Sequence, residues 1–258
     1  MSIAVITGAS SGMGRDFAEE IARIEDLDEI WLIARREDKL KELAGSLPCP
    51  ARIFALDLIE QQSIDSYAKA LTETAPEIAY LVNASGFGRF AYAPEVPLKD
   101  DLDMIDLNVK ALTALCFLSI PYMKPGSYII NMGSLSSFQP VPYINIYGAT
   151  KAYVLSFTRA LNVELRPLGI RAMAVCPGWV KTEFFDHAVT DNGAVTYYNK
   201  LWESKDVIVK AMKDLKKGKD VSVLGAGVRF QVLLCKLLPH RLVMKVWMKQ
   251  QKHSDRTA

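Results

Sequence analysis

Short apolar runs alternate with amphipathic stretches along most of the chain. The runs are rich in β-branched residues and are bounded by polar or turn-forming residues, which is typical of buried parallel strands. They lie at residues 3–6, 29–34, 52–58, 78–83, 128–132, 170–175 and 221–224. Because stretches with helical periodicity separate them, the pattern predicts an α/β protein. We expect one doubly wound Rossmann-type domain over residues 1–258, with a seven-stranded parallel sheet.

A glycine-rich turn follows the first of these runs. Residues 7–14 read TGASSGMG, and a helical pattern begins directly afterwards. Here Gly8 permits the tight turn, Gly12 lets the backbone approach a pyrophosphate, and Gly14 lets the helix pack closely on the strand. Free backbone N–H groups and the helix dipole favour a phosphate at this point, although a plain turn is the alternative. We expect a dinucleotide to contact Gly8, Ser10, Ser11, Gly12, Met13 and Gly14.

The residues after the second run indicate which dinucleotide is bound. An acidic residue there would pair with the ribose 2′-hydroxyl of NAD, whereas an arginine suits the 2′-phosphate of NADP. Ala34 stands near the position of the acid, and Arg35 and Arg36 follow it. We therefore expect NADP(H), with Arg35 as the main contact. The alternative is that both arginines only solvate a loop.

Other polar or small residues follow the ends of later runs. Asp57 could bind an adenine amino group or cap the next helix. Residues 83–86 leave room for a ribose, although an ordinary turn would read the same way. Because ligands of doubly wound sheets bind at the carboxyl ends of the strands, these segments should form one site. The expected cofactor contacts among them are Asp57, Leu58, Asn83, Ala84, Pro177 and Gly178.

Tyr147 and Lys151 are the candidates for proton chemistry. They are four residues apart, so a helix places them on one face. The ammonium group of Lys151 should favour the phenolate and lower the pKa of Tyr147, which would make the phenol an acid or base usable near neutral pH. Ser134 follows the fifth run and could hold the same substrate oxygen. On these residues alone, an amphipathic helix with an incidental tyrosine and lysine is the alternative.

In their order along the chain, these motifs resemble those of the short-chain dehydrogenase/reductase family, in its single-domain Tyr-x-x-x-Lys form. The similarity covers residues 7–182, roughly two-thirds of the chain. The matching motifs are Thr7-Gly8-x-x-x-Gly12-x-Gly14, Asp57-Leu58, Asn83-Ala84-Ser85-Gly86, Asn108, Ser134, Tyr147-x-x-x-Lys151, and Pro177-Gly178 with Thr182. The family often has Asn-Asn-Ala-Gly at the third motif, so Ser85 should reshape the pocket wall there.

The resemblance implies hydride transfer between a nicotinamide and a carbon that carries an oxygen. Tyr147 would exchange the proton, Ser134 would orient the substrate carbonyl, and Lys151 would hold the nicotinamide ribose. Asn108, a poor helix former within a helical stretch, would hold a water that connects Lys151 to solvent. The contacts implied for the nicotinamide carboxamide are Val180 and Thr182. Homodimers and homotetramers are both usual in the family.

Composition narrows the range of partners. The formal net charge of +2 is too small to predict nucleic-acid binding. The three histidines and four cysteines have no metal-ligand spacing, so we expect no metal site and reduced thiols. The first residues lack the features of a secretory signal, and no apolar run reaches the length of a spanning helix. We expect a cytoplasmic protein.

The last third of the chain should determine the substrate. A lid at residues 183–215 carries several aromatic residues, which favour a bulky apolar ketone or alcohol such as a hydroxysteroid. Rings that only pack the lid against the body are the alternative. A basic apolar extension at residues 226–258 should form two short helices broken near Pro239. It could lie on an anionic membrane surface, cover the pocket or form a dimer interface. The aromatic residues are Phe184, Phe185, Tyr197, Tyr198 and Trp202.

We therefore predict an NADP(H)-dependent oxidoreductase that interconverts a secondary alcohol and a ketone. One alternative is a 3-oxoacyl reductase, which would need basic residues near the site for the phosphate of an acyl carrier. The other is a non-catalytic dinucleotide sensor on the same fold. A sensor would have no use for the proton relay of Ser134, Tyr147, Lys151 and Asn108.

Overall fold

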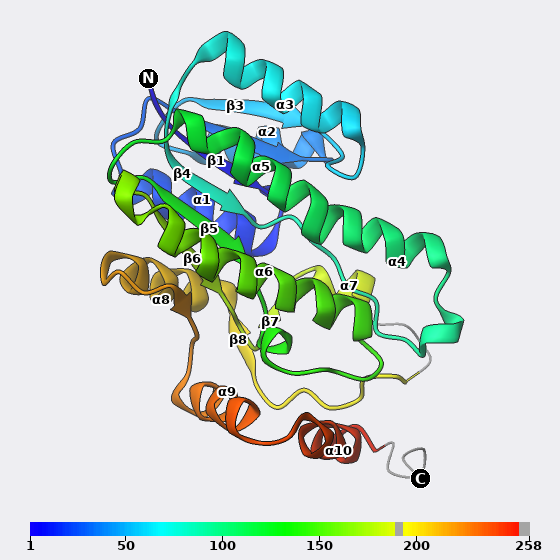
Figure 1. The fold of residues 1–258 in the computed structure, drawn as a ribbon. Coiled ribbons are helices and arrows are strands. Elements are labelled where there is room, and N and C mark those ends of the chain that lie inside the picture. Colours follow the sequence, from blue (N-terminus) through cyan, green and yellow to red (C-terminus); the bar gives the residue numbers. More distant parts are fainter. Residues whose placement is uncertain (189–192, 253–258) are drawn as a thin grey trace.

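A computed structural model describes residues 1–188 and 193–252, and its centre is a seven-stranded parallel sheet (Figure 1). The strand order is β3-β2-β1-β4-β5-β6-β9, so the chain reverses its direction of travel between β1 and β4. This confirms the predicted doubly wound Rossmann-type fold. The strands are β1 (Ser2–Thr7), β2 (Glu29–Ala34), β3 (Ala51–Ala55), β4 (Glu77–Asn83), β5 (Tyr128–Met132), β6 (Arg171–Val175) and β9 (Val221–Ser222), and a separate pair contains β7 (Trp179–Lys181) and β8 (Leu201–Glu203).

Helices cover both faces of this sheet (Figure 1). One layer contains α1 (Gly12–Ile24), α2 (Glu37–Ser46) and α8 (Ser204–Lys216). The other contains α3 (Gln61–Thr74), α5 (Leu112–Ser119) and α6 (Asn145–Glu164). The remaining helices are α4 (Leu98–Ile105), α7 (Phe184–Ala188), α9 (Ala226–Leu237) and α10 (His240–Gln250).

The apolar runs are continuous because both faces of the sheet are buried. In β1, Ala4 and Ile6 face the first helix layer, whereas Ile3 and Val5 face the second, and none of the four is exposed. Burial of each isoleucine or valine side chain contributes about 1.5–3 kcal/mol relative to its exposure to water. The core therefore fixes the strands and leaves their carboxyl ends as the edge where loops can carry function.

Two of the predicted boundaries differ in the structure. The third strand ends at Ala55 instead of reaching residue 58, because a turn begins there: the Ile59 N–H donates to Asp57 Oδ1 at 3.2 Å. The predicted lid at residues 183–215 is too long, because Val207 and Ile208 of α8 pack in the core of the sheet. Residues 189–192 of that lid and residues 253–258 of the predicted extension lie outside the described residues.

The long helical segment that includes α4 and α5 contains one irregular turn. Between α4 and α5, residues Asp106–Ala111 form a wider π-helical turn that contains Asn108. Within the described residues, the helix Leu98–Tyr122 is long and apolar enough to cross a membrane, with a mean hydropathy of 1.4, contrary to the expectation from the apolar runs. A core helix passes the same test, and 39% of this window is buried. Since Leu115 and Cys116 pack in the core, we assign the helix to the fold.

Candidate active site

A cavity of about 560 Å³ lies at the carboxyl ends of the central strands. Its size is typical of small-molecule sites. It extends from Arg35 and Asp57 past the glycine turn to Tyr147 and Lys151. Almost all of the residues expected at the site line this one cavity. They are Gly8, Ser10, Ser11, Gly12, Met13, Gly14, Arg35, Asp57, Leu58, Ala84, Ser134, Tyr147, Lys151, Pro177, Gly178, Val180 and Thr182.

Asn83 is not among the residues that line the cavity. Its side chain is 2% exposed, and Nδ2 donates to Asn131 Oδ1 at 2.9 Å and to Cys116 Sγ at 3.3 Å. The side chain therefore holds the ends of β4 and β5 together behind the cavity wall. A cofactor contact through this side chain, as expected from the sequence, does not fit its position.

Asn108 also lies behind the wall, where it joins three segments. Its Oδ1 accepts from the Phe87 N–H at 3.1 Å, and its Nδ2 donates to the Phe87 carbonyl at 2.9 Å and to Thr150 Oγ1 at 3.1 Å. The side chain is 1% exposed. Both donors of the amide are thus occupied by protein atoms. Asn108 holds the loop after β4 against α6, the helix that carries Tyr147 and Lys151.

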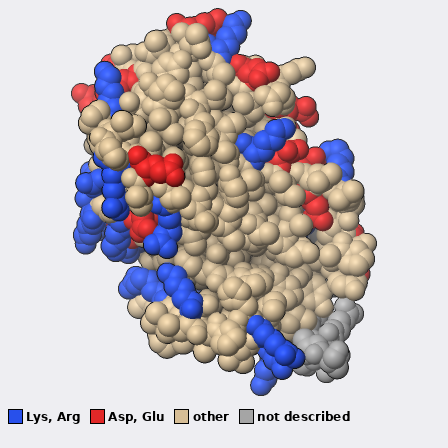
Figure 2. All heavy atoms as spheres, viewed as in Figure 1, with Lys and Arg blue, Asp and Glu red and all other residues tan. Residues whose placement is uncertain are grey.

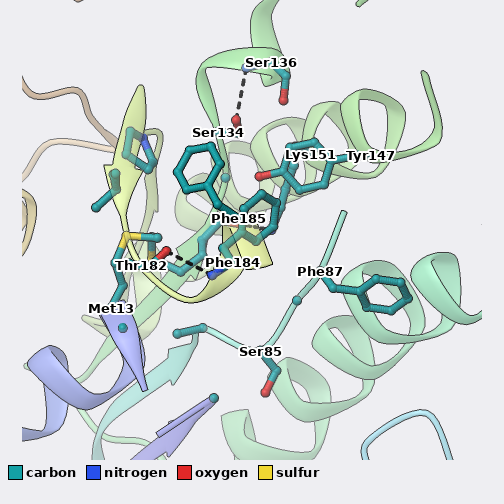
Figure 3. Close-up of a pocket in the computed structure, with 18 of the residues that line it drawn as sticks. Met13, Ser85, Phe87, Ser134, Ser136, Tyr147, Lys151, Thr182, Phe184 and Phe185 are labelled. Carbon is teal, nitrogen blue, oxygen red and sulfur yellow. Dashed lines mark hydrogen bonds between the residues drawn. The ribbon is translucent and has the colours of Figure 1, made fainter. Parts of the chain in front are cut away.

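Ser134, Tyr147 and Lys151 surround one part of the cavity (Figure 3). Ser134 follows β5 with an extended backbone and caps the next short helix (Leu135–Phe138), because its Oγ accepts from the Ser136 N–H at 3.2 Å. The Nζ of Lys151 donates to the Met132 carbonyl at 2.7 Å and lies 5.6 Å from the centre of the Tyr147 ring. The predicted helical pair is therefore present on one face of α6, and the end of β5 faces it.

Burial shifts the pKa values of Tyr147 and Lys151. Desolvation raises the pKa of Tyr147 to about 12, and a hydrogen bond with the Ser134 hydroxyl opposes the rise. Desolvation also lowers the pKa of Lys151 to about 8, although the nearby Cys176 opposes this change. The expected lowering of the Tyr147 pKa by Lys151 is therefore not found. Loss of water on burial is the largest cause of the raised pKa of Tyr147.

The opposite end of the cavity carries two arginines. Arg35 is exposed and lies 3.9 Å from the Asp57 carboxylate. Arg36 is held more firmly, since its guanidinium donates to Ser10 Oγ at 3.2 Å and to Glu183 Oε2 at 2.8 Å. This contact lowers the pKa of Glu183. The sequence singled out Arg35, but the distance of Glu183 along the chain concealed its link to Arg36.

The backbone at this end forms a cradle that fits a dinucleotide phosphate group. A Cβ on Gly8, which has φ of +66°, would lie 2.8 Å from the Ala84 backbone, so only glycine allows the turn to sit this close to β4. A Cβ on Gly12 would lie 3.1 Å from Thr182 Cγ2, across the cavity. Because α1 begins at Gly12, its N-terminal N–H groups lie at this point. These residues would hold the pyrophosphate, with the arginines beyond it.

Aromatic rings surround the catalytic end. Of the five rings expected at the lid, Phe184, Phe185 and Tyr197 line the cavity. Tyr198 packs behind them, and Trp202 stacks under Lys200 at 3.8 Å, away from the cavity. Further rings come from outside the lid, and no local pattern in the sequence indicated them. They include Phe90, Trp179 and Trp247, and the amide side chains of the cavity include Gln139, Asn199, Gln231 and Gln250.

The C-terminal helices are part of this wall. Gln231 of α9 and Trp247 of α10 line the cavity, and Trp247 Nε1 donates to the Pro142 carbonyl at 3.1 Å. Gln251 is 1% exposed, and its Oε1 accepts from the N–H groups of Thr196 and Tyr197 at 2.8 and 2.9 Å. The end of α10 is thereby fastened to the segment that carries Tyr197.

A doubly wound sheet with a serine, a tyrosine and a lysine at the end of a glycine-lined trough defines a class of oxidoreductase. The family model described as "short chain dehydrogenase" matches residues 2–193, and the chain belongs to this family.

Several known proteins are similar to this chain. Sulfoacetaldehyde reductase 2 of Chromohalobacter salexigens is 36% identical over 194 residues, which cover 70% of this chain and 74% of that protein. A short-chain dehydrogenase from Sphingobium yanoikuyae, solved in complex with NADPH, is 28% identical, with a TM-score of 0.79 over 90% of this chain and 92% of that one. The bulky-bulky ketone specific alcohol dehydrogenase from Comamonas testosteroni is 25% identical, with a TM-score of 0.73 over 97% and 95% of the two chains.

Proposed function

We propose that this protein is an NADP(H)-dependent oxidoreductase that interconverts a secondary alcohol and a ketone on a bulky apolar substrate such as a hydroxysteroid. The observation that carries the proposal is one cavity in which Ser134, Tyr147 and Lys151 lie between a phosphate cradle and an aromatic chamber. We define the aromatic chamber as the part lined by Phe90, Trp179, Phe184, Phe185, Tyr197 and Trp247.

Each side chain of the site has a separate role in carbonyl reduction. The bound nicotinamide would supply the hydride. Tyr147, whose pKa is raised to about 12, holds its proton at neutral pH and can donate it to the developing alkoxide. Ser134 offers a hydroxyl to the same oxygen. Lys151, with a pKa near 8, is mostly cationic at neutral pH and favours negative charge on that oxygen and on the phenol.

The arginine pair supports NADP(H) as the cofactor. Arg35 and Arg36 line the cavity at the end opposite Tyr147, and Arg35 keeps an exposed guanidinium. A guanidinium binds phosphate oxygens through paired hydrogen bonds. Among the similar structures, the dehydrogenase from Sphingobium yanoikuyae holds NADPH, and a serine dehydrogenase that is 27% identical holds NADP+. A contact of the 2′-phosphate with Arg35 is thus part of the proposal.

The aromatic chamber supports a bulky substrate. Phe90, Trp179 and Phe184 pack edge to face or tilted around the Tyr147 side of the cavity. Such rings provide a large apolar contact area, while the amides of Gln139, Gln231 and Gln250 can orient a distant polar group. The name of the dehydrogenase from Comamonas testosteroni, at 25% identity, likewise refers to bulky ketones.

We also propose that the protein forms a cytoplasmic homodimer or homotetramer. An exposed apolar stripe supports this assembly, since Leu98, Leu102 and Ile105 occupy one face of α4 with 71%, 50% and 38% exposure. Phe117 continues the exposed surface along the same long helix, at 57%. A second copy could bury this stripe in a symmetric contact.

The proposal can be tested by mixing the protein with NADPH or NADH and a steroid, bile-acid, acyl or small alicyclic ketone. The absorbance of the reduced cofactor then measures its oxidation. We expect turnover with NADPH and a fused-ring ketone. Tyr147→Phe should lower kcat by about 100-fold or more and leave NADPH binding intact. Tyr153→Phe on the same helix, whose hydroxyl only contacts Thr113, is the matched control and should keep its activity. Equal turnover of the Tyr147→Phe protein would refute the mechanism. Absence of turnover with every ketone, while NADPH still binds to the parent protein, would favour a dinucleotide sensor.

A further inference from the structure

The last two helices expose an apolar surface on the side away from the body. On α9, Phe230, Leu233, Leu234 and Leu237 follow helical spacing and are 61%, 49%, 38% and 70% exposed. The opposite side of α9 buries Val228, Val232 and Cys235, so this helix is apolar on both sides. The exposed surface continues over α10. We define the outward apolar face as Phe230, Leu233, Leu234, Leu237, Leu238, Leu242 and Val246.

Exposed hydrophobic side chains are concentrated on this face more than elsewhere in the molecule. Seven of the nineteen large hydrophobic side chains that are exposed among the described residues belong to it. Single exposed apolar residues need no explanation, but a contiguous patch marks a surface that binds something. The ribbon view shows α9 and α10 following one another at the same end of the molecule (Figure 1).

Positive charge surrounds the outward apolar face. Arg241, Lys245 and Lys249 recur at every fourth residue, so they form a stripe along α10 beside Leu242 and Val246. Residues 226–252 contain no aspartate or glutamate. Among the described residues, no ion pair includes any of the basic residues of this segment. These are Arg229, Lys236, Arg241, Lys245, Lys249 and Lys252.

The space-filling view agrees with this distribution (Figure 2). At the end of the molecule that carries α9 and α10, the visible coloured side chains are basic, and uncharged surface lies between them. Elsewhere on the same face, acidic and basic groups are interspersed. The charge therefore belongs to this segment and not to the protein as a whole, whose formal net charge is only +2.

We infer that α9 and α10 form a docking face for a membrane surface that contains anionic lipid. An amphipathic helix with basic residues beside apolar ones lies in the plane of the headgroups and buries its apolar side. The two helices have 12 and 11 residues, too short to span a bilayer. A symmetric contact between two copies would place the same basic stripe near itself without acidic partners, whereas anionic headgroups neutralise it.

Docking would bring the active site to the bilayer. The same two helices contribute Gln231, Trp247 and Gln250 to the cavity wall, and Gln251 fastens α10 to the segment that carries Tyr197. A bulky apolar substrate is concentrated in membranes and could reach the aromatic chamber from there. This consequence rests on the proposed function, whereas docking itself does not depend on turnover.

Co-sedimentation of the full-length protein with vesicles tests the inference without any substrate. We expect binding to vesicles of phosphatidylserine and phosphatidylcholine in equal parts, little binding to phosphatidylcholine alone, and weaker binding as salt increases. The triple variant Arg241→Gln, Lys245→Gln, Lys249→Gln should lower the partition coefficient by about tenfold or more. The variant Phe230→Gln, Leu233→Gln, Leu237→Gln should abolish binding, because the apolar contribution is lost.

Matched controls separate docking from nonspecific charge and from misfolding. The variant Lys213→Gln, Lys216→Gln, Lys217→Gln removes three exposed basic residues from the last turn of α8 and the residue after it, and should leave vesicle binding unchanged. Every variant should keep the thermal unfolding midpoint of the parent protein, since the replaced side chains are exposed. Absence of the full-length protein from anionic vesicle pellets would overturn the inference. A second outcome would also overturn it: the parent protein is a dimer in solution, and the apolar triple variant is a monomer whose vesicle binding is unchanged. The outward apolar face would then join two copies of the chain.

Discussion

Replacement of Lys151 by methionine should make the protein more stable while it removes activity. Lys151 is 5% exposed, and burial lowers its pKa from 10.5 to about 8. At about 1.4 kcal/mol per pH unit, this difference corresponds to a cost of about 3 kcal/mol for the charged form in the folded state. Loss of the hydrogen bond to the Met132 carbonyl offsets about 1 kcal/mol of the gain. We expect a net gain of about 2 kcal/mol in the free energy of unfolding near pH 7.

The pH dependence of this gain makes the test specific. Between pH 8 and 10.5 the unfolded state binds more protons at Lys151 than the folded state does, so the parent protein becomes more stable as pH rises through this window. The Lys151→Met variant lacks that rise, and its advantage should shrink. Urea unfolding at several pH values measures the difference, with exposed Lys213→Met on α8 as the control. A variant less stable than the parent at pH 7, or an advantage independent of pH, would refute the reasoning.

Two further substitutions test how the surroundings hold the site. Gly88→Ala would place a Cβ 2.9 Å from Tyr147 Cδ2, so the ring must move, and kcat should fall by about tenfold. Gly45→Ala, with no atom within 4 Å of the new Cβ, is its control, and equal kcat values in the two variants would contradict this. Asn108→Ala leaves the Phe87 backbone without its buried partners and should lower the free energy of unfolding by about 2–4 kcal/mol, measured with urea. A loss below about 1 kcal/mol would show that these bonds are replaced by others.

Features that depend on neighbours in the chain could be predicted from the sequence. The run at 29–34 matches β2 (Glu29–Ala34) because a strand buried on both faces needs apolar residues throughout. The glycine turn and the Tyr147–Lys151 pair were equally predictable, since a few adjacent residues determine their geometry. The sequence marked Asn108 only as a poor helix former within a helical stretch, and the structure places it in the π-helical turn.

Features that depend on tertiary contacts could not be predicted in the same way. Phe90, Trp179 and Trp247 are far apart in the chain and meet only in the folded cavity. The sequence indicated a lysine one turn from Tyr147, but only the fold shows that burial raises the pKa of this tyrosine. Likewise, Asn83 at the end of β4 was expected to contact the cofactor, but its side chain donates a hydrogen bond to Asn131 instead.

The bond between Arg36 and Glu183 has a thermodynamic consequence. Arg36 lines the cavity beside Arg35, the proposed contact of the 2′-phosphate, and Glu183 precedes the aromatic segment beginning at Phe184. A phosphate and the Glu183 carboxylate would compete for one guanidinium, so cofactor affinity and the position of that segment would be linked. Linkage is reciprocal: a substrate that holds the segment in one position would change cofactor affinity by the same factor by which the cofactor changes substrate affinity. A single surface ion pair would thus set the cooperativity between the two ends of the cavity.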